Sequence, residues 1–180
     1  MSRLWPVILL VAVGAIVAWS GVHPHDRLTW WLEVAPVFLA LAILLPTYRR
    51  FRMTDLAYVL IAIHAVILAV GGKYTYALNP LFDWLREVFG WSRNHYDRLG
   101  HFAQGFVPAL VTRELLLRTS PLRQGKWLFA LVTLFCLGIS ALYELLEWLA
   151  AIRLGQASDS FLGTQGDPWD TQSDMARLTR

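Results

Sequence analysis

The sequence has few charged residues and a single cysteine. Charged residues make up 16% of the 180 residues, whereas soluble globular domains carry about 25%. The lone Cys136 excludes an internal disulfide and any multi-cysteine zinc site. The chain also lacks a nucleotide-binding glycine loop, a Gly-x-Ser-x-Gly nucleophile motif and a nucleic-acid-binding pattern. Nucleotide-dependent chemistry, covalent catalysis through serine and nucleic-acid partners therefore have no support in the sequence.

Hydrophobic residues, by contrast, make up 56% of the chain and gather in long runs. A bilayer core about 30 Å thick needs roughly 20 apolar residues per helix. We therefore expect an all-α, polytopic membrane bundle in which residues 1–180 form one integral membrane domain. The predicted spans cover residues 4–22, 28–46, 56–72, 99–117 and 127–151, and residues 155–180 form a tail. The first run has an alternative interpretation as a signal peptide, because Ala18-Trp19-Ser20 resembles a cleavage site.

The distribution of cations predicts the orientation, since lysine and arginine concentrate in cytoplasmic loops. Two loops, at residues 48–52 and 118–126, carry cations and no acids, whereas the tail carries several aspartates. The cations of these loops are Arg49, Arg50, Arg52, Arg118, Arg123 and Lys126. We therefore expect the N-terminus to be cytoplasmic and the tail to lie on the outer side of the membrane.

The segment between the third and fourth spans predicts a short amphipathic helix. Apolar residues recur there at helical spacing, and Asn79-Pro80 is typical of a helix start. The apolar set is Leu81, Phe82, Leu85, Val88 and Phe89. We expect this helix to lie on the outer membrane surface. A re-entrant segment packed against the bundle fits the pattern equally well.

Pairs of ionisable residues lie near the outer ends of two spans. Asp97 and His101 open the fourth span four residues apart, so they share one helix face. Glu144 and Glu147 lie in the last third of the fifth span, and Ser140 precedes Glu144 by one turn. Ionisable residues within membrane spans are costly, and they are therefore candidates for function.

The tail is expected to return to the same side of the membrane. Asp167-Pro168 is typical of a helix start, and Asp170 and Asp174 would share one face of the short helix that follows. Glu33, at the outer end of the second span, is a further contributor. The sequence thus predicts that separate segments bring carboxylates and one histidine to the same depth.

Carboxylates that lie close together repel each other unless one is protonated or a cation is bound. Carboxylate oxygens with an imidazole suit a divalent ion such as Mg²⁺, Mn²⁺, Ca²⁺, Fe²⁺ or Zn²⁺, and the residue types do not choose among them. We expect Asp97, His101, Asp170 and Asp174 to bind the metal. Two alternatives stay open: a protonated, hydrogen-bonded network that includes a glutamate, and solvated tail acids paired with arginines such as Arg93.

The motif residues also resemble a known family. Segments 95–101, 104–108, 113–114, 143–148 and 161–175 closely resemble the YjdF-like family of bacterial inner-membrane proteins. The most specific match is Thr164-Gln165-Gly166-Asp167-Pro168-Trp169-Asp170-Thr171-Gln172-Ser173-Asp174-Met175. The resemblance implies a polytopic protein of the bacterial inner membrane and no known activity. The signature residues that it implies are Asp97, His101, Glu144, Glu147, Asp167, Asp170 and Asp174.

The resemblance also bears on the end of the chain. Members of the YjdF-like family continue beyond Asp174-Met175 into a sixth apolar span. Residues 176–180 are too few and too polar to cross a membrane, so we expect a shortened or naturally truncated member. The Asp-x3-His-Phe opening of the fourth span is faintly similar to VanZ-like membrane proteins.

The predicted cluster favours a membrane-embedded metalloenzyme that acts on a lipid-linked or amphiphilic substrate. A bound divalent ion would polarise a phosphoryl or carbonyl oxygen and lower the pKa of a water molecule, with Glu144 or Glu147 as general base. The alternatives are a proton- or ion-coupled carrier and a non-catalytic structural or partner-binding subunit. No motif specifies the substrate, the reaction class, the metal or the oligomeric state.

Overall fold

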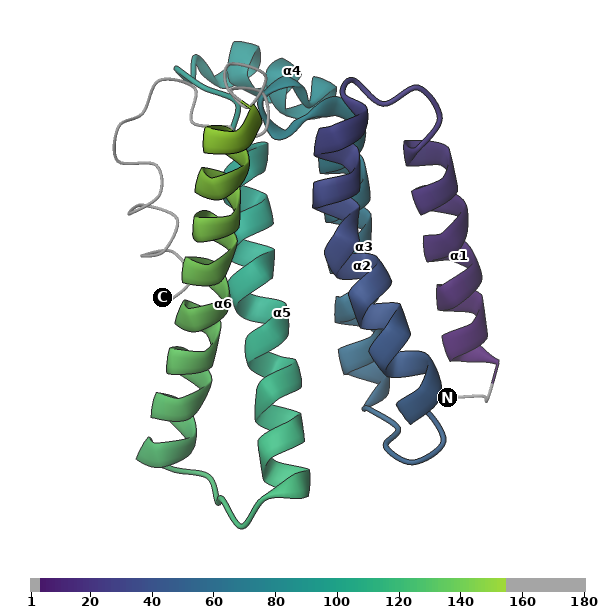
Figure 1. The fold of residues 1–180 in the computed structure, drawn as a ribbon, viewed down its shortest axis with the longest axis vertical. Coiled ribbons are helices and arrows are strands. Elements are labelled where there is room, and N and C mark those ends of the chain that lie inside the picture. The colour runs from purple at the N-terminus through teal and green to yellow at the C-terminus, as the bar shows by residue number, and fades with distance from the viewer. Residues whose placement is uncertain (1–3, 155–180) are drawn as a thin grey trace. The chain divides into compact units, whose positions relative to one another are not determined.

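In a computed structural model, residues 4–154 are described, apart from the side chains of Glu147, Trp148, Ala150 and residues 151–154. Every regular element in this part of the chain is a helix (Figure 1). The long helices are α1 (Trp5–Ser20), α2 (Arg27–Thr47), α3 (Asp55–Tyr74), α5 (Tyr96–Thr119) and α6 (Lys126–Leu154). A short 3-10 helix, η1 (Tyr76–Leu78), and α4 (Pro80–Phe89) connect α3 to α5. The all-α prediction is confirmed, and each predicted span coincides with a long helix.

Length and composition mark some of these helices as membrane spans. Within the described residues, three helical segments are long and apolar enough to cross a bilayer: α2, α3 and Lys126–Leu146 of α6. Helix α1 is apolar but has only 16 residues. Helix α5 has 24 residues but includes Asp97, Arg113 and other charged side chains. Crossing of the membrane by α1 and α5 therefore stays a prediction.

The chain forms two compact units, Met1–Gly100 and His101–Arg180. The single integral membrane domain predicted for residues 1–180 stays a prediction. In the first unit, α3 packs against both α1 and α2 (Figure 1). Its buried core consists of Val13, Val34, Val37, Ala65 and Leu68. These aliphatic side chains face one another between the three helices, so α3 is the centre of this unit.

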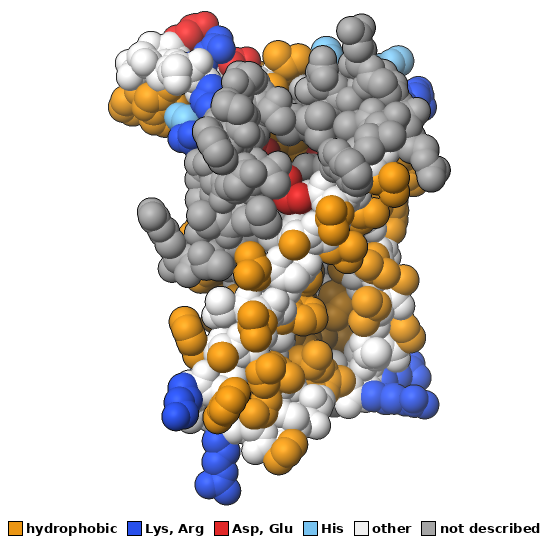
Figure 2. All heavy atoms as spheres, turned by 60° about the vertical axis from the view of Figure 1, so that its left-hand side comes forward, with side chains coloured by type: hydrophobic (Ala, Val, Ile, Leu, Met, Phe, Trp, Pro, Cys, Tyr) orange, Lys and Arg blue, Asp and Glu red, His pale blue; other side chains and the backbone are white. Residues whose placement is uncertain are grey.

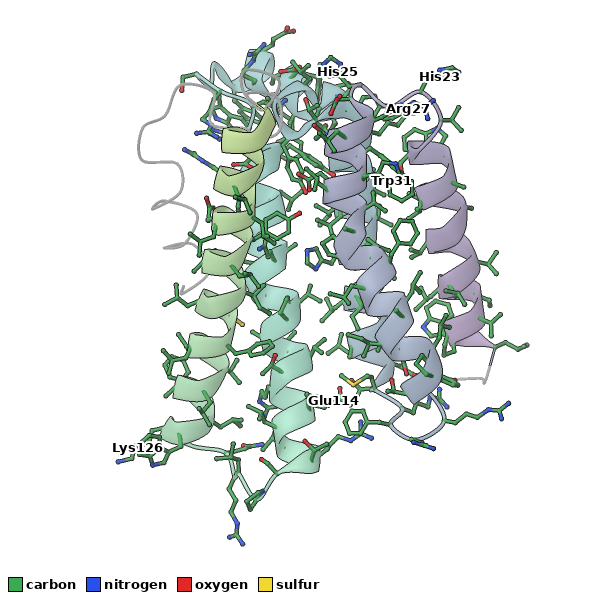
Figure 3. All side chains as sticks on the ribbon, viewed as in Figure 1. His23, His25, Arg27, Trp31, Glu114 and Lys126 are labelled. Atoms are coloured by element: carbon green, nitrogen blue, oxygen red, sulfur yellow. The ribbon has the colours of Figure 1, made fainter. Side chains whose placement is uncertain are left out.

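The α1–α2 loop is attached to the end of α3. The His25 amide donates a hydrogen bond to the Lys73 carbonyl at 2.9 Å, and the Lys73 ammonium donates to the Val22 carbonyl at 2.7 Å. The Asp26 carboxylate caps α2 by accepting from the Thr29 amide at 2.7 Å. This bond to the Thr29 amide is the main reason why the pKa of Asp26 lies below its usual range. The side chains of His23 and His25 lie in this loop (Figure 3).

Helix α4 confirms the helix start predicted at Asn79-Pro80. The Asn79 side chain accepts a hydrogen bond from the Phe82 amide at 3.3 Å, and Pro80 occupies the first helical position. Gly90 ends the helix in a left-handed conformation at φ +65°. None of the residues of α4 is buried. The surface helix and the re-entrant segment packed against the bundle both stay predictions. The apolar side chains that it exposes are Leu81, Trp84, Val88 and Phe89.

In the second unit, α5 and α6 run antiparallel and are joined by residues 120–125 (Figure 1). Glu114 lies in the last part of α5 and Lys126 at the start of α6 (Figure 3). The Cys136 thiol donates to the Gly105 carbonyl at 3.7 Å, so the two helices touch at this level. Apolar side chains extend along the surface of the helices and cations lie at their ends (Figure 2). Such a surface is typical of helices that face lipid.

Candidate functional site

Buried polar residues gather at one end of the first unit, where the α1–α2 loop and α4 lie. We name this set the polar layer: Glu33, Thr75, Asn79, Arg93, Asn94 and Asp97. Each of these residues exposes 9% of its surface or less. They come from α2, from the turn after α3, from the start of α4 and from the segment that opens α5. Distant parts of the sequence therefore bring polar groups together at this end of the unit.

The central pair of the polar layer is Arg93 and Asp97. The Arg93 guanidinium nitrogen lies 3.6 Å from the Asp97 carboxylate, and both side chains are about nine-tenths buried (10% and 9% exposed). Removing charges from water is costly, and an opposite charge at this distance compensates part of the cost. The structure therefore gives Asp97 a cationic partner within its own segment, where the sequence analysis had considered Arg93 as a partner for tail acids.

Asn94 connects the elements around this pair. Its side-chain oxygen accepts a hydrogen bond from the amide of Tyr96, the first residue of α5, at 3.0 Å. Its side-chain nitrogen donates to the Asn79 carbonyl at 3.0 Å and to the Asp83 carboxylate at 3.2 Å. One fully buried amide thus fixes the start of α4 against the start of α5, which positions Asp97.

Tyr76 packs into a slot lined by glycines. A Cβ atom added to Gly71 would lie 2.7 Å from the Tyr76 ring, and one added to Gly100 would lie 2.6 Å from it. Real side chains do not approach this closely, so the ring fits only because both positions lack a side chain. The first turn of α5 therefore lies directly against the turn that follows α3.

Thr75 has an unusual backbone conformation in that turn. Its φ is +60° with ψ of 153°, a region that β-branched residues rarely adopt. It is 1% exposed, and none of the described residues forms a hydrogen bond with its hydroxyl oxygen. Backbone strain of this kind costs about 1–3 kcal/mol and clusters at functional sites. The polar layer thus contains a strained backbone at Thr75, and packing of apolar side chains does not require this strain.

Glu33 lies in the same layer, and its contribution to the carboxylate cluster stays a prediction. It is 3% exposed. A Cβ atom added to Gly72 would approach the Glu33 side chain to 3.2 Å, so Glu33 lies against the last turn of α3. The first unit therefore buries two carboxylates, Glu33 and Asp97, at one end.

The second unit carries polar residues of its own. His101 is 9% exposed and lies one turn after Asp97 on α5, and Ser140 on α6 is 1% exposed. Glu144 follows Ser140 by one turn and is half-buried. Two buried atoms here, the Ser140 hydroxyl oxygen and the Gln104 amide nitrogen, have no hydrogen-bond partner among the described residues.

The predicted metal site is only partly covered by the described residues. Asp97, His101 and Glu144 are described, whereas the Glu147 side chain and both tail ligands, Asp170 and Asp174, lie outside the described residues. Among the described side chains, no group of three or more His, Cys, Asp or Glu residues is placed to hold a metal ion. The metal site therefore stays a prediction.

Sequence reasoning missed several residues that organise these regions. The sequence held a signal for two of them: Arg93 precedes Asp97 by four residues, and Asn94, a residue type common at helix starts, stands two residues before α5. No sequence signal identifies the slot for Tyr76, because it depends on glycines from two distant helices. Gln104 and Ser140 also look ordinary in the sequence, and only their burial without partners singles them out.

Helical architecture, apolar exposed surfaces and buried polar groups near helix ends define a helical membrane protein. Residues 5–179 match the family described as "Predicted membrane protein (DUF2238)", and the chain belongs to this family. The chain is 52% identical over 179 residues to "Inner membrane protein YjdF" of Escherichia coli (strain K12). The aligned region covers 97% of this chain and 86% of that relative. No solved structure matches the chain. The resemblance to the YjdF-like family is confirmed.

Proposed function

We propose that the protein is an enzyme of the bacterial inner membrane that acts on a lipid-linked or amphiphilic substrate with a divalent metal ion. The name of the Escherichia coli relative supports the location. Cations in the loops at residues 48–52 and 118–126 support a cytoplasmic N-terminus and a tail on the outer side. In this orientation the polar layer and His101 lie at the depth of the outer lipid headgroups, where phosphate and ester groups are found.

The observation that carries the proposal is the buried pair Asp97 and His101. They lie one turn apart on one face of α5, and they expose only 6% and 9% of their surfaces. A carboxylate and an imidazole held out of water in an apolar protein are costly. Buried ionisable groups in a membrane protein are candidates for sites that bind ions or move protons.

The roles of the residues follow from their chemistry. The proposed metal ligands are Asp97, His101, Asp170 and Asp174, with Glu144 or Glu147 as a further ligand or the general base. Carboxylate oxygens and an imidazole nitrogen suit divalent cations. Arg93 already pairs with Asp97. A metal ion would therefore bind the Asp97 carboxylate together with Arg93, or it would displace the Arg93 guanidinium from this carboxylate. A bound ion would polarise a phosphoryl or carbonyl oxygen, and the glutamate would take a proton from the attacking water.

The ion pair between Arg93 and Asp97 favours a second candidate function. The Asn94 side chain joins the starts of α4 and α5 next to a buried ion pair, without any ligand. In this second candidate the protein is a structural or partner-binding subunit, and the acidic residues stabilise its fold. A Glu147→Gln variant separates the two functions: it abolishes activity with intact folding in an enzyme, and it lowers thermal stability in a structural subunit.

The direct test is an activity screen on lipids. The purified full chain is incubated with an inner-membrane lipid extract and each divalent metal in turn, and the products are followed by mass spectrometry. We expect one lipid class to be converted by the wild type, with loss of conversion on chelation and in His101→Gln. His64→Gln, a histidine of α3 outside the site, serves as the matched control and keeps the activity. Conversion that persists in His101→Gln, or its absence with every metal, would contradict the proposal.

A further inference from the structure

The hydroxyl of Ser140 differs from the hydroxyls of Ser20, Thr47 and Thr119. Serine and threonine in membrane helices usually donate to a carbonyl of the preceding turn. The Ser20 hydroxyl does so at 2.8 Å, Thr47 at 2.6 Å and Thr119 at 2.7 Å. Ser140 forms no such bond to its own helix, although it is 1% exposed. Its hydroxyl is therefore available to a group outside α6.

The register of the antiparallel helices places other polar groups at the same level. The contact between Cys136 and Gly105 aligns α5 with α6. One turn further on α6 is Ser140, and the antiparallel direction makes His101 its counterpart on α5 (Figure 1). The described buried side chains of α6, Leu128, Cys136 and Ser140, lie at spacings of eight and four, so they share the face that meets α5.

Gln104 adds a second unsatisfied group to this level. It follows His101 by three residues and therefore lies next to it on the surface of α5. Its amide nitrogen is buried, and no described residue accepts a hydrogen bond from it. A buried donor without an acceptor is unfavourable in the protein alone and is satisfied when an oxygen binds there. Ser140 on α6 and Gln104 on α5 thus carry two buried donors without a partner among the described residues, both within one turn of the level of His101.

We propose that Ser140, Gln104 and His101 form a binding site for a phosphate or ester group, whose oxygens accept hydrogen bonds from the Ser140 hydroxyl and the Gln104 amide. Both donors are uncharged, and the imidazole lies on the same level. These groups suit oxygen acceptors rather than apolar chains. The inference rests on the proposed function, because it names the groups that hold the oxygens of its substrate. The source of the phosphate is either a lipid headgroup or free phosphate, and the experiment distinguishes them.

The test measures whether a water-soluble reagent reaches a thiol placed at this site, and whether a bound ligand protects that thiol from the reagent. Ser140→Cys is made in a Cys136→Ala background, and its reaction with a charged, water-soluble thiosulfonate reagent is timed on the detergent-purified full chain. Native Cys136 of the wild type, one turn away on the same face, is the matched buried control. We expect the thiol at position 140 to react at least about tenfold faster than Cys136, because a binding site for a polar group must admit polar molecules.

Protection identifies the ligand. Short-chain phosphatidylglycerol that slows the reaction, with no effect of inorganic phosphate, identifies a lipid headgroup; slowing by inorganic phosphate identifies free phosphate. Gln104→Cys in the same background must show the same protection. If Ser140→Cys does not fold, the Gln104→Cys result alone tests the binding site. A rate as slow as that of Cys136, or no protection by either probe, overturns the inference. The metal content of the same samples is also measured. It tests the proposed metal-dependent function independently of the thiol protection.

Discussion

Ser20 in the first unit and Ser140 in the second are both buried serines of long helices, with 0% and 1% of their surfaces exposed. The Ser20 hydroxyl donates to the Val17 carbonyl and accepts from the Trp30 indole nitrogen, both at 2.8 Å. Ser140 has no partner among the described residues. The same residue type at the same burial is thus satisfied in one unit and unsatisfied in the other.

Other polar groups show both states: the Thr75 hydroxyl of the first unit, like Ser140, has no partner among the described residues. In the first unit, Arg93 pairs with Asp97, and Asn94 bonds to the starts of α4 and α5. In the second unit, the Gln104 amide nitrogen is buried without a partner. Polar groups that satisfy one another stabilise a fold, whereas unsatisfied buried groups call for another explanation, such as a ligand or water.

The largest effect is expected from Arg93→Met, which removes the cationic partner of Asp97. Loss of one member of a buried ion pair costs about 3–5 kcal/mol of the free energy of unfolding. The matched control is Arg86→Met, since Arg86 pairs with Asp83 at 3.5 Å with 40% and 31% of the side chains exposed. That exposed pair contributes at most about 1 kcal/mol. Unfolding in detergent measures both variants, and equal losses would contradict the structural role of the buried pair.

A smaller effect is expected from Gly100→Ala. The added methyl group would overlap the Tyr76 ring, which Gly71 confines from another side. Overpacking of this kind destabilises by about 1–3 kcal/mol. Gly138→Ala in α6 is the matched control, because nothing lies within 4 Å of its added Cβ, and alanine favours the helix. The unfolding temperature should fall in Gly100→Ala and rise slightly in Gly138→Ala, relative to the wild type. An unchanged unfolding temperature in Gly100→Ala would show that the Tyr76 ring is not tightly packed against Gly100.

The two serines provide the most direct comparison. Ser20→Ala leaves the Trp30 indole nitrogen without its acceptor and should cost about 1–2 kcal/mol. Ser140→Ala removes no hydrogen bond to a described residue, so its stability should stay close to that of the wild type or rise. Thermal unfolding of both variants in the same detergent checks this. A loss in Ser140→Ala as large as that in Ser20→Ala would remove the difference between the two serines.

The smallest effect concerns the pH dependence of the first unit. The pKa of Asp26 is lowered in the folded state by the Thr29 amide, so its capping bond contributes stability above the unfolded pKa of about 4. This contribution is lost as the pH falls through the folded pKa. Asp26→Asn keeps a capping side chain that does not titrate. The wild type should therefore lose more stability than Asp26→Asn between pH 6 and pH 3, as measured by unfolding midpoints; equal slopes would show that Asp26 does not contribute.

The helices were predictable because apolar runs of about 20 residues leave little choice of structure in a membrane. The helix starts at Asp26, Thr54 and Asn79 have capping residues that the sequence displays. The amphipathic helix α4 followed from the spacing of its apolar residues. Helix capping and the spacing of apolar residues depend on neighbouring residues only, so they can be predicted from the sequence.

The site was less predictable because it depends on contacts between distant segments. The sequence analysis considered Arg93 only as a partner for tail acids, whereas in the structure Arg93 pairs with Asp97. Burial of Ser140 without a partner depends on how α5 meets α6, which no single segment encodes. The tail ligands, Asp170 and Asp174, lie outside the described residues, and their role stays a prediction.

The most direct test of the account is the metal content of the purified protein, measured by mass spectrometry beside an Asp97→Ala/Glu147→Ala double variant. We predict about one or two equivalents of a single divalent metal in the wild type, as in known metalloenzyme sites, and their loss in the double variant with the helical content unchanged. A well-folded wild type that holds no metal, even after divalent ions are added back, would contradict the metalloenzyme function. The buried carboxylates would then belong to a structural network.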